Sequence, residues 1–85
     1  MILLGSIASI LAREYGKPVF LFKKGKKESC GSTRSSLDND LVQAMKSCSD
    51  LLMTFGGHPK AAGFRLKNEN LEEFKNCLIR YFKEL

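Results

Sequence analysis

The segment 55–64, with the sequence FGGHPKAAGF, contains the residues best suited to hold an anion. Gly56 and Gly57 carry no side chains, so a phosphate could approach the main-chain N–H groups around them. His58, the chain's only histidine, adds a side-chain hydrogen-bond donor. The same residues also fit a helix end followed by a turn, with His58 packed or solvated. Taken alone, the segment leaves both interpretations open.

A second group of polar residues occupies positions 31–36, with the sequence GSTRSS. Arg34 offers a planar guanidinium group, which suits two-point binding of a phosphate. The hydroxyl groups of Ser32 and Ser35 could donate to the remaining phosphate oxygens. Because serine is also common in turns, an ordinary loop is the alternative interpretation.

Positive charge is concentrated around this second group. The net charge is +5, and six basic residues against one acidic residue between positions 17 and 34 account for all of it. Such a patch attracts nucleic-acid phosphates, although lysines also protect exposed sheet edges from pairing. The lysines that we predict to contact a nucleic-acid backbone are Lys23, Lys24, Lys26, Lys27 and Lys60.

The side chains that hydrolysis would need are scarce in this chain. A metal-dependent nuclease holds its ions with several carboxylates and histidines. Here there is one histidine, and Asp38, Asp40 and Asp50 occupy positions typical of helix caps. We therefore expect no metal ion, no cofactor and no catalytic residue in this chain.

The three cysteines, at positions 30, 48 and 77, form no Cys-x-x-Cys motif. Their odd number and wide spacing predict reduced thiols, some of them in the core, and therefore a cytoplasmic protein. No apolar run approaches the ~20 residues that a bilayer-spanning helix requires, so we expect no membrane partner.

Hydrophobic periodicity predicts the elements that position these residues. Apolar spacings of three and four predict helices over 2–15, over 41–53 with an interruption near positions 49–50, and from 71 onward. An apolar run predicts a strand over 19–22, and weaker patterns predict strands over 28–34 and 61–66. The expected fold is one α/β (α+β) domain over residues 1–85. It is a small mixed sheet with three helices, in the order helix, strand, strand, helix, strand, helix.

Glycines and polar residues are expected to bound these elements. Gly16 suits the left-handed position after the first helix, and Gly25 is expected in a turn that needs a positive φ. The glycines at 56–57 would end the second helix. The residues expected to cap helix starts are Asp38 or Asp40 for the second helix and Asn70, with Glu73, for the last. Because the first helix starts almost at residue 1 and the sheet is thin, we expect a fragment of a longer protein.

Five segments, in this order along the chain, together resemble a known domain. They are GSIAS (5–9) with YGKPV (15–19), GSTRS (31–35), DL (40–41) through CSDLL (48–52), FGGH (55–58) with AAGF (61–64), and NLEEF (70–74). The chain resembles the substrate-binding domain that follows the catalytic domain in the DHH phosphoesterase family, and most closely that of the RecJ-type exonucleases. It departs from the family at Ile10, where a basic residue is common, and it lacks the Asp-His-His motif of the catalytic domain.

The resemblance implies a role for each polar group. Arg34, helped by Ser32 and Ser35, would hold a substrate phosphate, and the segment 56–58 would line the cleft near the scissile end. The implied partners are single-stranded DNA and the DHH domain of the same protein, where Mn²⁺ or Mg²⁺ would serve hydrolysis. The implied setting is DNA repair and recombination in the cytoplasm.

Two alternatives stay open from the sequence. The chain could be the substrate domain of an oligoribonuclease or cyclic-dinucleotide phosphodiesterase of the same family, or a free-standing nucleic-acid-binding module. In either case we do not expect catalysis by the isolated chain. An exposed sheet edge could also join two copies of the chain.

Overall fold

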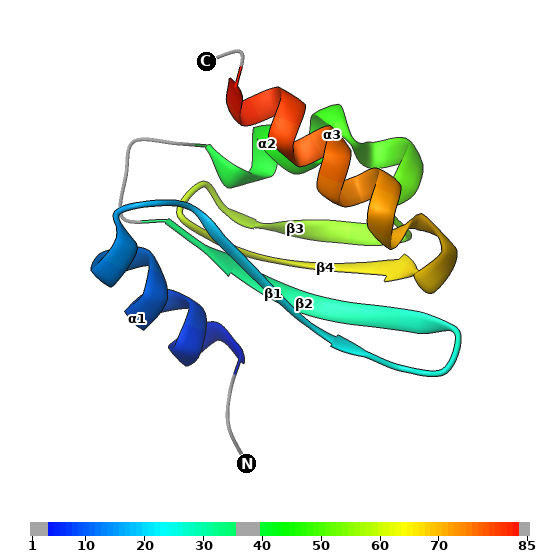
Figure 1. Ribbon diagram of the computed structural model, residues 1–85, viewed down its shortest axis with the longest axis horizontal. Helices are drawn as coiled ribbons and strands as arrows, with labels where there is room; N and C mark the ends of the chain where they lie inside the picture. Colours follow the sequence, from blue (N-terminus) through cyan, green and yellow to red (C-terminus); the bar gives the residue numbers. More distant parts are fainter. Residues whose placement is uncertain (1–3, 36–39, 84–85) are drawn as a thin grey trace.

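A computed structural model describes residues 4–35 and 40–83 as a four-stranded sheet with helices on both sides (Figure 1). The elements are α1 (Leu4–Tyr15), β1 (Val19–Lys24), β2 (Glu28–Arg34), α2 (Leu41–Ser47), the 3-10 turn η1 (Ser49–Leu51), β3 (Thr54–His58), β4 (Ala61–Lys67), the 3-10 turn η2 (Asn68–Asn70) and α3 (Leu71–Lys83). The strands lie side by side in the order β1-β2-β4-β3. Helices α2 and α3 lie above the sheet in Figure 1, and α1 lies below it.

The predicted α+β class and its three helices are confirmed, but the sheet differs from the prediction in two ways. Residues Thr54–His58 form β3, where we expected the second helix to end in a turn. The pairings of β1 with β2, β2 with β4 and β4 with β3 are all antiparallel, so the described sheet is not mixed. Strand β3 forms because β4 offers it a partner, beginning with a bond from the Met53 N–H to the Arg65 carbonyl oxygen at 2.8 Å.

Most of the predicted element ends are confirmed. Gly16 has a φ of 62°, the left-handed conformation expected after α1. The Asp40 side chain caps α2 by accepting a hydrogen bond from the Gln43 N–H at 3.0 Å. Helix α2 ends at Ser47 and η1 follows, so the interruption near positions 49–50 is confirmed. Positions 2, 3 and 38, which the predictions also include, lie outside the described residues.

The predicted role of Gly25 is wrong. Its φ is not positive, because Gly16 and Gly57 are the glycines with positive φ among the described residues. A Cβ atom at Gly25 would instead lie 2.6 Å from the Glu28 carbonyl oxygen, so the tight turn itself excludes a side chain. At the start of α3, the Asn70 amide donates to the Leu51 carbonyl oxygen at 3.3 Å and ties η2 to η1.

A disulfide joins Cys48 to Cys77, which corrects the prediction of three reduced thiols. Cys48 follows the last residue of α2 and Cys77 lies in α3, and the two helices pack against each other. Their separation of 29 residues hid this proximity in the sequence. Cys30 is a free, exposed thiol. Because disulfides persist mainly in oxidising compartments, the cysteines no longer argue for the cytoplasm.

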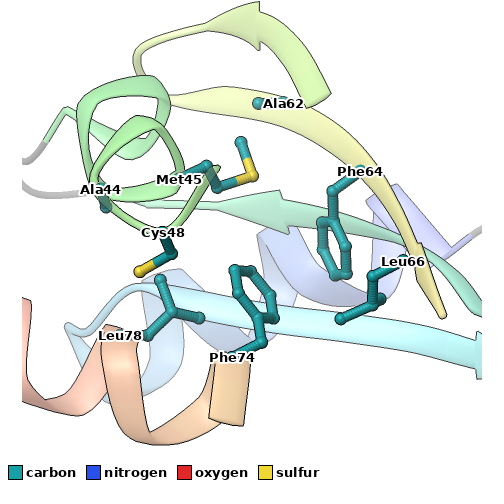
Figure 2. Close-up of a cluster of buried hydrophobic side chains, with 8 residues drawn as sticks. All are labelled: Ala44, Met45, Cys48, Ala62, Phe64, Leu66, Phe74 and Leu78. Atoms are coloured by element: carbon teal, nitrogen blue, oxygen red, sulfur yellow. The ribbon is translucent and has the colours of Figure 1, made fainter. Parts of the chain in front are cut away.

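The hydrophobic core lies between the sheet and the pair α2 and α3. Figure 2 shows its buried residues: Ala44 and Met45 from α2, Cys48 directly after α2, Phe74 and Leu78 from α3, and Ala62, Phe64 and Leu66 from β4. The ring of Phe64 lies 5.4 Å from that of Phe74 and 6.0 Å from that of Phe20, between centroids. Burying each such side chain contributes about 1.5–3 kcal/mol, so this cluster fixes the position of β4 in the sheet.

Candidate nucleic-acid interface

On the side of the sheet that faces away from α2 and α3, no helix among the described residues packs over β3 and β4. Successive side chains of a strand point to opposite sides. Since Ala62, Phe64 and Leu66 enter the core, Ala61, Gly63 and Arg65 point the other way. Helix α1 lies on that side but packs against β1 and β2 (Figure 1). We call the uncovered area the open face; its residues are Thr54, Gly56, Ala61, Gly63 and Arg65.

The strand register brings the two predicted motifs together. Arg34 pairs with Ala61, and Ala61 pairs with His58, so these residues form one row across the sheet. The row two residues further along contains Ser32, Gly63 and Gly56 in the same way. Directly opposed Cα atoms are about 5 Å apart, which places the Cα atoms of Arg34 and His58 about 10 Å apart.

Arg34 is held in place by the end of the sheet and by α1. Its Nη1 atom donates to the carbonyl oxygens of Thr33 at 2.8 Å and Ala62 at 3.4 Å. The guanidinium group lies so close to Gly5 of α1 that a Cβ atom there would overlap it. Nε and Nη2 make no hydrogen bond with the described residues. A positioned guanidinium with donors left over is suited to bind an anion.

A hollow of about 470 Å³ lies beside Arg34, between α1 and the ends of β2 and β4. It is lined by Ser9, Ala12, Arg13, Arg34, Ser35, Lys60 and Ala61. Three of these side chains are basic and none is acidic, so the hollow favours anions. Sequence reasoning missed Arg13. The available signal was its position four residues after Ser9, which places both on one face of α1.

His58 lies at the end of β3, where a two-residue turn leads into β4. Its Nδ1 atom accepts a hydrogen bond from the Lys60 N–H at 3.3 Å. In the neutral ring the proton is then on Nε2, which can donate to a ligand. The turn itself is fixed by bonds from the Leu41 N–H to the Pro59 carbonyl oxygen at 2.7 Å and from the Ser35 N–H to the Lys60 carbonyl oxygen at 3.1 Å.

The two predicted glycines have different surroundings. Gly57 has a φ of 135°, and a Cβ atom there would lie 2.8 Å from the Ala61 carbonyl oxygen. The fold therefore requires glycine at position 57. Gly56 has an ordinary strand conformation, and a Cβ atom there would meet nothing within 4 Å.

The lysines predicted to contact a nucleic-acid backbone lie at two separate places in the structure. Lys60 lines the hollow beside Arg34. The other lysines, Lys23, Lys24, Lys26 and Lys27, lie at the end of β1 and in the turn to β2. The pair Lys24–Ser29 is five pairs along the ladder from the pair Val19–Arg34, or about 17 Å at 3.3 Å per residue. The turn is anchored by Asn68, whose amide donates to the Gly25 carbonyl oxygen at 2.8 Å.

The described residues do not fit a metal site. Across positions 4–35 and 40–83, no group of three or more histidine, cysteine or acidic side chains could hold a metal ion. In the same ranges, no helix has the length and apolar character needed to cross a membrane.

A larger groove, of about 1150 Å³, lies on the opposite side of the sheet between β1 and α3. Its lining is mainly apolar and includes Phe20, Phe22, Ile79 and Phe82. Phe22 is 46% exposed and Ile79 is 44% exposed. Of the residues predicted to contact nucleic acid, Lys24 lines this groove, whereas Arg34, Ser32 and His58 do not, so the groove is separate from the Arg34 row.

Comparisons with known proteins identify the family to which this chain is similar. The model of the DHHA1 domain matches residues 1–84. The chain is 37% identical over 78 residues to the single-stranded-DNA-specific exonuclease RecJ of Thermus thermophilus, covering 92% of this chain and 11% of that protein. It is 33% identical over 76 residues to RecJ of Bacillus subtilis, covering 87% and 10%. It is 37% identical over 89 residues to a putative prophage-derived single-strand DNA-specific exonuclease, YorK, of Bacillus subtilis, covering 98% and 16%.

Solved structures give the same result. The crystal structure of Thermus thermophilus RecJ with Mg²⁺ superposes with a TM-score of 0.84 and 33% identity, covering 95% of this chain and 12% of that one. A structure of exonuclease RecJ bound to manganese superposes with a TM-score of 0.82 and 32% identity, covering 95% and 20%. The chain thus spans 10–16% of the length of these curated relatives. Since the family model covers nearly every residue, this chain belongs to the DHHA1 domain family.

Proposed function

We propose that this chain is the substrate-binding domain of a RecJ-type exonuclease that acts on single-stranded DNA. The observation that carries the proposal is the pair of cross-sheet rows, which sets Arg34, Ser32 and His58 beside one surface that no described helix covers. The similarity to proteins named as single-stranded-DNA-specific exonucleases supports this choice of substrate. Hydrolysis would take place in a DHH domain outside this sequence, with Mn²⁺ or Mg²⁺ held there.

Each polar group has a distinct task in this proposal. Arg34 binds a phosphate through Nε and Nη2, the two guanidinium atoms that make no hydrogen bond within the described residues. Ser32 is two residues away on the same side of β2 and donates its hydroxyl to the same phosphate. His58 donates from Nε2 at the far end of the row. Charge-assisted hydrogen bonds of this kind are about twice as strong as neutral ones, so Arg34 contributes most.

The hollow beside Arg34 extends the phosphate track. Arg13 and Lys60 stand at its rim and would attract the next phosphate along the strand. The lysines of the β1–β2 turn would meet a more distant part of the strand. Because these contacts are mainly electrostatic, affinity should fall steeply with salt concentration. The same proposal implies a cytoplasmic site of action, where single-stranded DNA arises during repair and recombination.

The test is a titration of a fluorescent thymidine oligomer with the 85-residue chain at low salt. We expect Arg34→Ala to weaken binding by about tenfold or more, since a hydrogen bond to a charged group contributes about 1.5–3 kcal/mol. Arg80→Ala is the matched control, because Arg80 is an exposed arginine of α3 on the other side of the sheet. Equal losses in both variants would contradict the assignment of Arg34.

The same titration separates the alternatives. Binding of a cyclic dinucleotide, with none of the DNA oligomer, would favour the phosphodiesterase alternative. Submicromolar affinity for DNA at physiological salt would favour a free-standing module, because one wall of a two-domain cleft should bind weakly. Concentration-dependent sedimentation would test whether two copies join through the sheet edge.

A further inference from the structure

The disulfide between Cys48 and Cys77 fixes a part of α3 that polar contacts leave unattached. Near the start of α3, the Asn70 amide ties η2 to η1 through the Leu51 carbonyl oxygen at 3.3 Å. Further along the helix, Cys77 is bonded to Cys48, directly after α2. Across positions 4–35 and 40–83, no side-chain hydrogen bond or ion pair joins α3 after Cys77 to another element. We call this part, residues 78–83, the distal end of α3.

Packing holds the distal end only in part. Leu78 is buried and belongs to the core cluster. Tyr81 and Phe82 are half-buried, and the Phe82 ring lies 6.3 Å from that of Phe20, between centroids. The distal end is shorter than two helical turns, and a helix of that length is not stable on its own. Its position therefore depends on the attachment at Cys77.

The bond lies where a reductant can reach it. Cys48 is 3% exposed, whereas Cys77 is half-buried. The Cys77 sulfur is therefore the one that an incoming thiolate can attack. The proposed function implies a cytoplasmic setting, where disulfides are usually transient and serve redox sensing. Only this choice of setting rests on the proposed function.

We propose that the Cys48–Cys77 bond is a redox switch, which fixes the distal end of α3 when formed and releases it when a dithiol reduces the bond. One thiolate of the dithiol attacks the Cys77 sulfur, and the Cys48 sulfur leaves as a thiolate and takes up a proton. The second thiolate of the dithiol attacks the first dithiol sulfur in the mixed disulfide, and Cys77 leaves in the same way. Two electrons thus pass to the cysteine pair, and the dithiol becomes a disulfide.

The switch changes one wall of the groove between β1 and α3. The residues of the distal end that line this groove are Leu78, Ile79, Phe82 and Lys83. The opposite wall belongs to β1, which the pairing with β2 holds in place. Helix α2 also keeps its position, because Leu41, Ala44 and Met45 are fully buried. Reduction therefore opens the groove and exposes apolar surface, while the Arg34 row on the other side of the sheet is unchanged.

The experiment measures amide hydrogen exchange by NMR in the 85-residue chain, first oxidised and then reduced with dithiothreitol. The measured quantity is the exchange rate of the Phe82 amide relative to that of the Phe64 amide in β4. Reduction should raise this ratio by at least about tenfold, because local opening needs less free energy than global unfolding. An unchanged ratio would overturn the switch, since the bond would then stabilise the whole domain evenly.

Two variants control for the chemistry of the thiols. Cys30→Ser removes the free, exposed thiol and keeps the bonded pair, so its ratio should respond to dithiothreitol as in the wild type. The double variant Cys48→Ser, Cys77→Ser should have the high ratio with and without dithiothreitol. A double variant that responds to dithiothreitol would contradict the assignment of the switch to this pair.

A titration with mixtures of reduced and oxidised glutathione gives a second readout. Free thiols, counted by alkylation and mass spectrometry, should fall by two as the mixture becomes more oxidising. A pair that stays bonded in a large excess of reduced glutathione would be a permanent cross-link, and a pair that stays reduced in oxidised glutathione would be no bond at all. Either result would overturn the switch. Because neither measurement uses DNA, both results would leave the proposed function intact.

Discussion

The two sides of the sheet are built by opposite means although they share the same strands. Along β4, Phe64 enters a cluster of aromatic rings, while its neighbour Gly63 presents bare main chain. On the side of α2 and α3, the large residues of the core cluster pack against one another (Figure 2). On the open face, Gly56 has no neighbour that explains it. Packing within the chain accounts for residues such as Phe64. Packing does not account for Gly56, and such a residue indicates contact with a ligand.

The largest expected effect concerns the side of the sheet that packs against α2 and α3, the packed side. Phe64→Ala removes a ring that is 4% exposed and should cost about 3–5 kcal/mol of unfolding free energy. Domains of this size have little stability to lose, so the variant should be largely unfolded by circular dichroism. Arg65→Ala, the next residue on the other side, should change stability by less than about 1 kcal/mol. Similar losses in the two variants would contradict the division between the sides.

The Cys48–Cys77 disulfide allows a second test of the packed side, because it joins the end of α2 to α3. Closing a loop of 29 residues stabilises a fold by about 3–4 kcal/mol in the chain-entropy account. Adding a phosphine reductant should therefore lower the urea midpoint markedly. The double variant Cys48→Ser, Cys77→Ser should start at the lower midpoint and not respond to reductant. A wild type that ignores reductant would show that the bond does not form in solution.

Substitutions of two glycines on opposite sides of the sheet, Gly31 and Gly63, compare the two sides directly. A Cβ atom on Gly31 would collide with the Leu21 carbonyl oxygen and the Phe64 ring. Gly31→Ala should thus cost about 1–3 kcal/mol from overpacking. Gly63→Ala, across the ladder from Ser32, should leave the urea midpoint unchanged or raise it. Equal destabilisation by both changes would mean that the open face also needs its glycines for folding.

The smallest effect concerns one buried hydroxyl. Thr33 is fully buried, and its Oγ1 atom has no hydrogen-bond partner among the described residues. Thr33→Val keeps the shape and removes the unsatisfied group, so it should stabilise the chain by up to about 1 kcal/mol. Ser32→Ala, on the other side of β2, should change thermal stability little. A clear loss of stability in Thr33→Val would point to a partner for the hydroxyl in solution.

Local signals predicted most of the fold, and the missed parts depend on long-range contacts. The apolar spacing of α1 and the glycine after it are properties of neighbouring residues, and both predictions are confirmed. Strand β3 has no such signal, because Gly56, Gly57 and His58 do not alternate apolar and polar residues. It exists because β4 pairs with it. The Cys48–Cys77 bond likewise depends on how α2 and α3 pack.

The candidate interface was also predicted only in part, because its arrangement depends on long-range strand pairing. The residue types of Arg34 and His58 indicated anion binding, but only the register places them in one row with Ala61 between them. The lysines at 23–27 are close to Arg34 in sequence, which predicts one basic patch. The extended hairpin carries them away from it along β1 and β2. Gly63 belonged to the AAGF signature but had no predicted role of its own, because its pairing with Gly56 appears only in the strand register.

The most direct test of the central claim is a map of amide chemical shifts in the ¹⁵N-labelled chain during titration with a thymidine hexamer. If DNA binds the open face, the largest shifts should occur at Ser32, Arg34, Gly56 and Gly63, and the shifts at Phe74 and Leu78, on the side of α2 and α3, should be small. Shifts confined to the groove between β1 and α3, or to the β1–β2 turn, would contradict it.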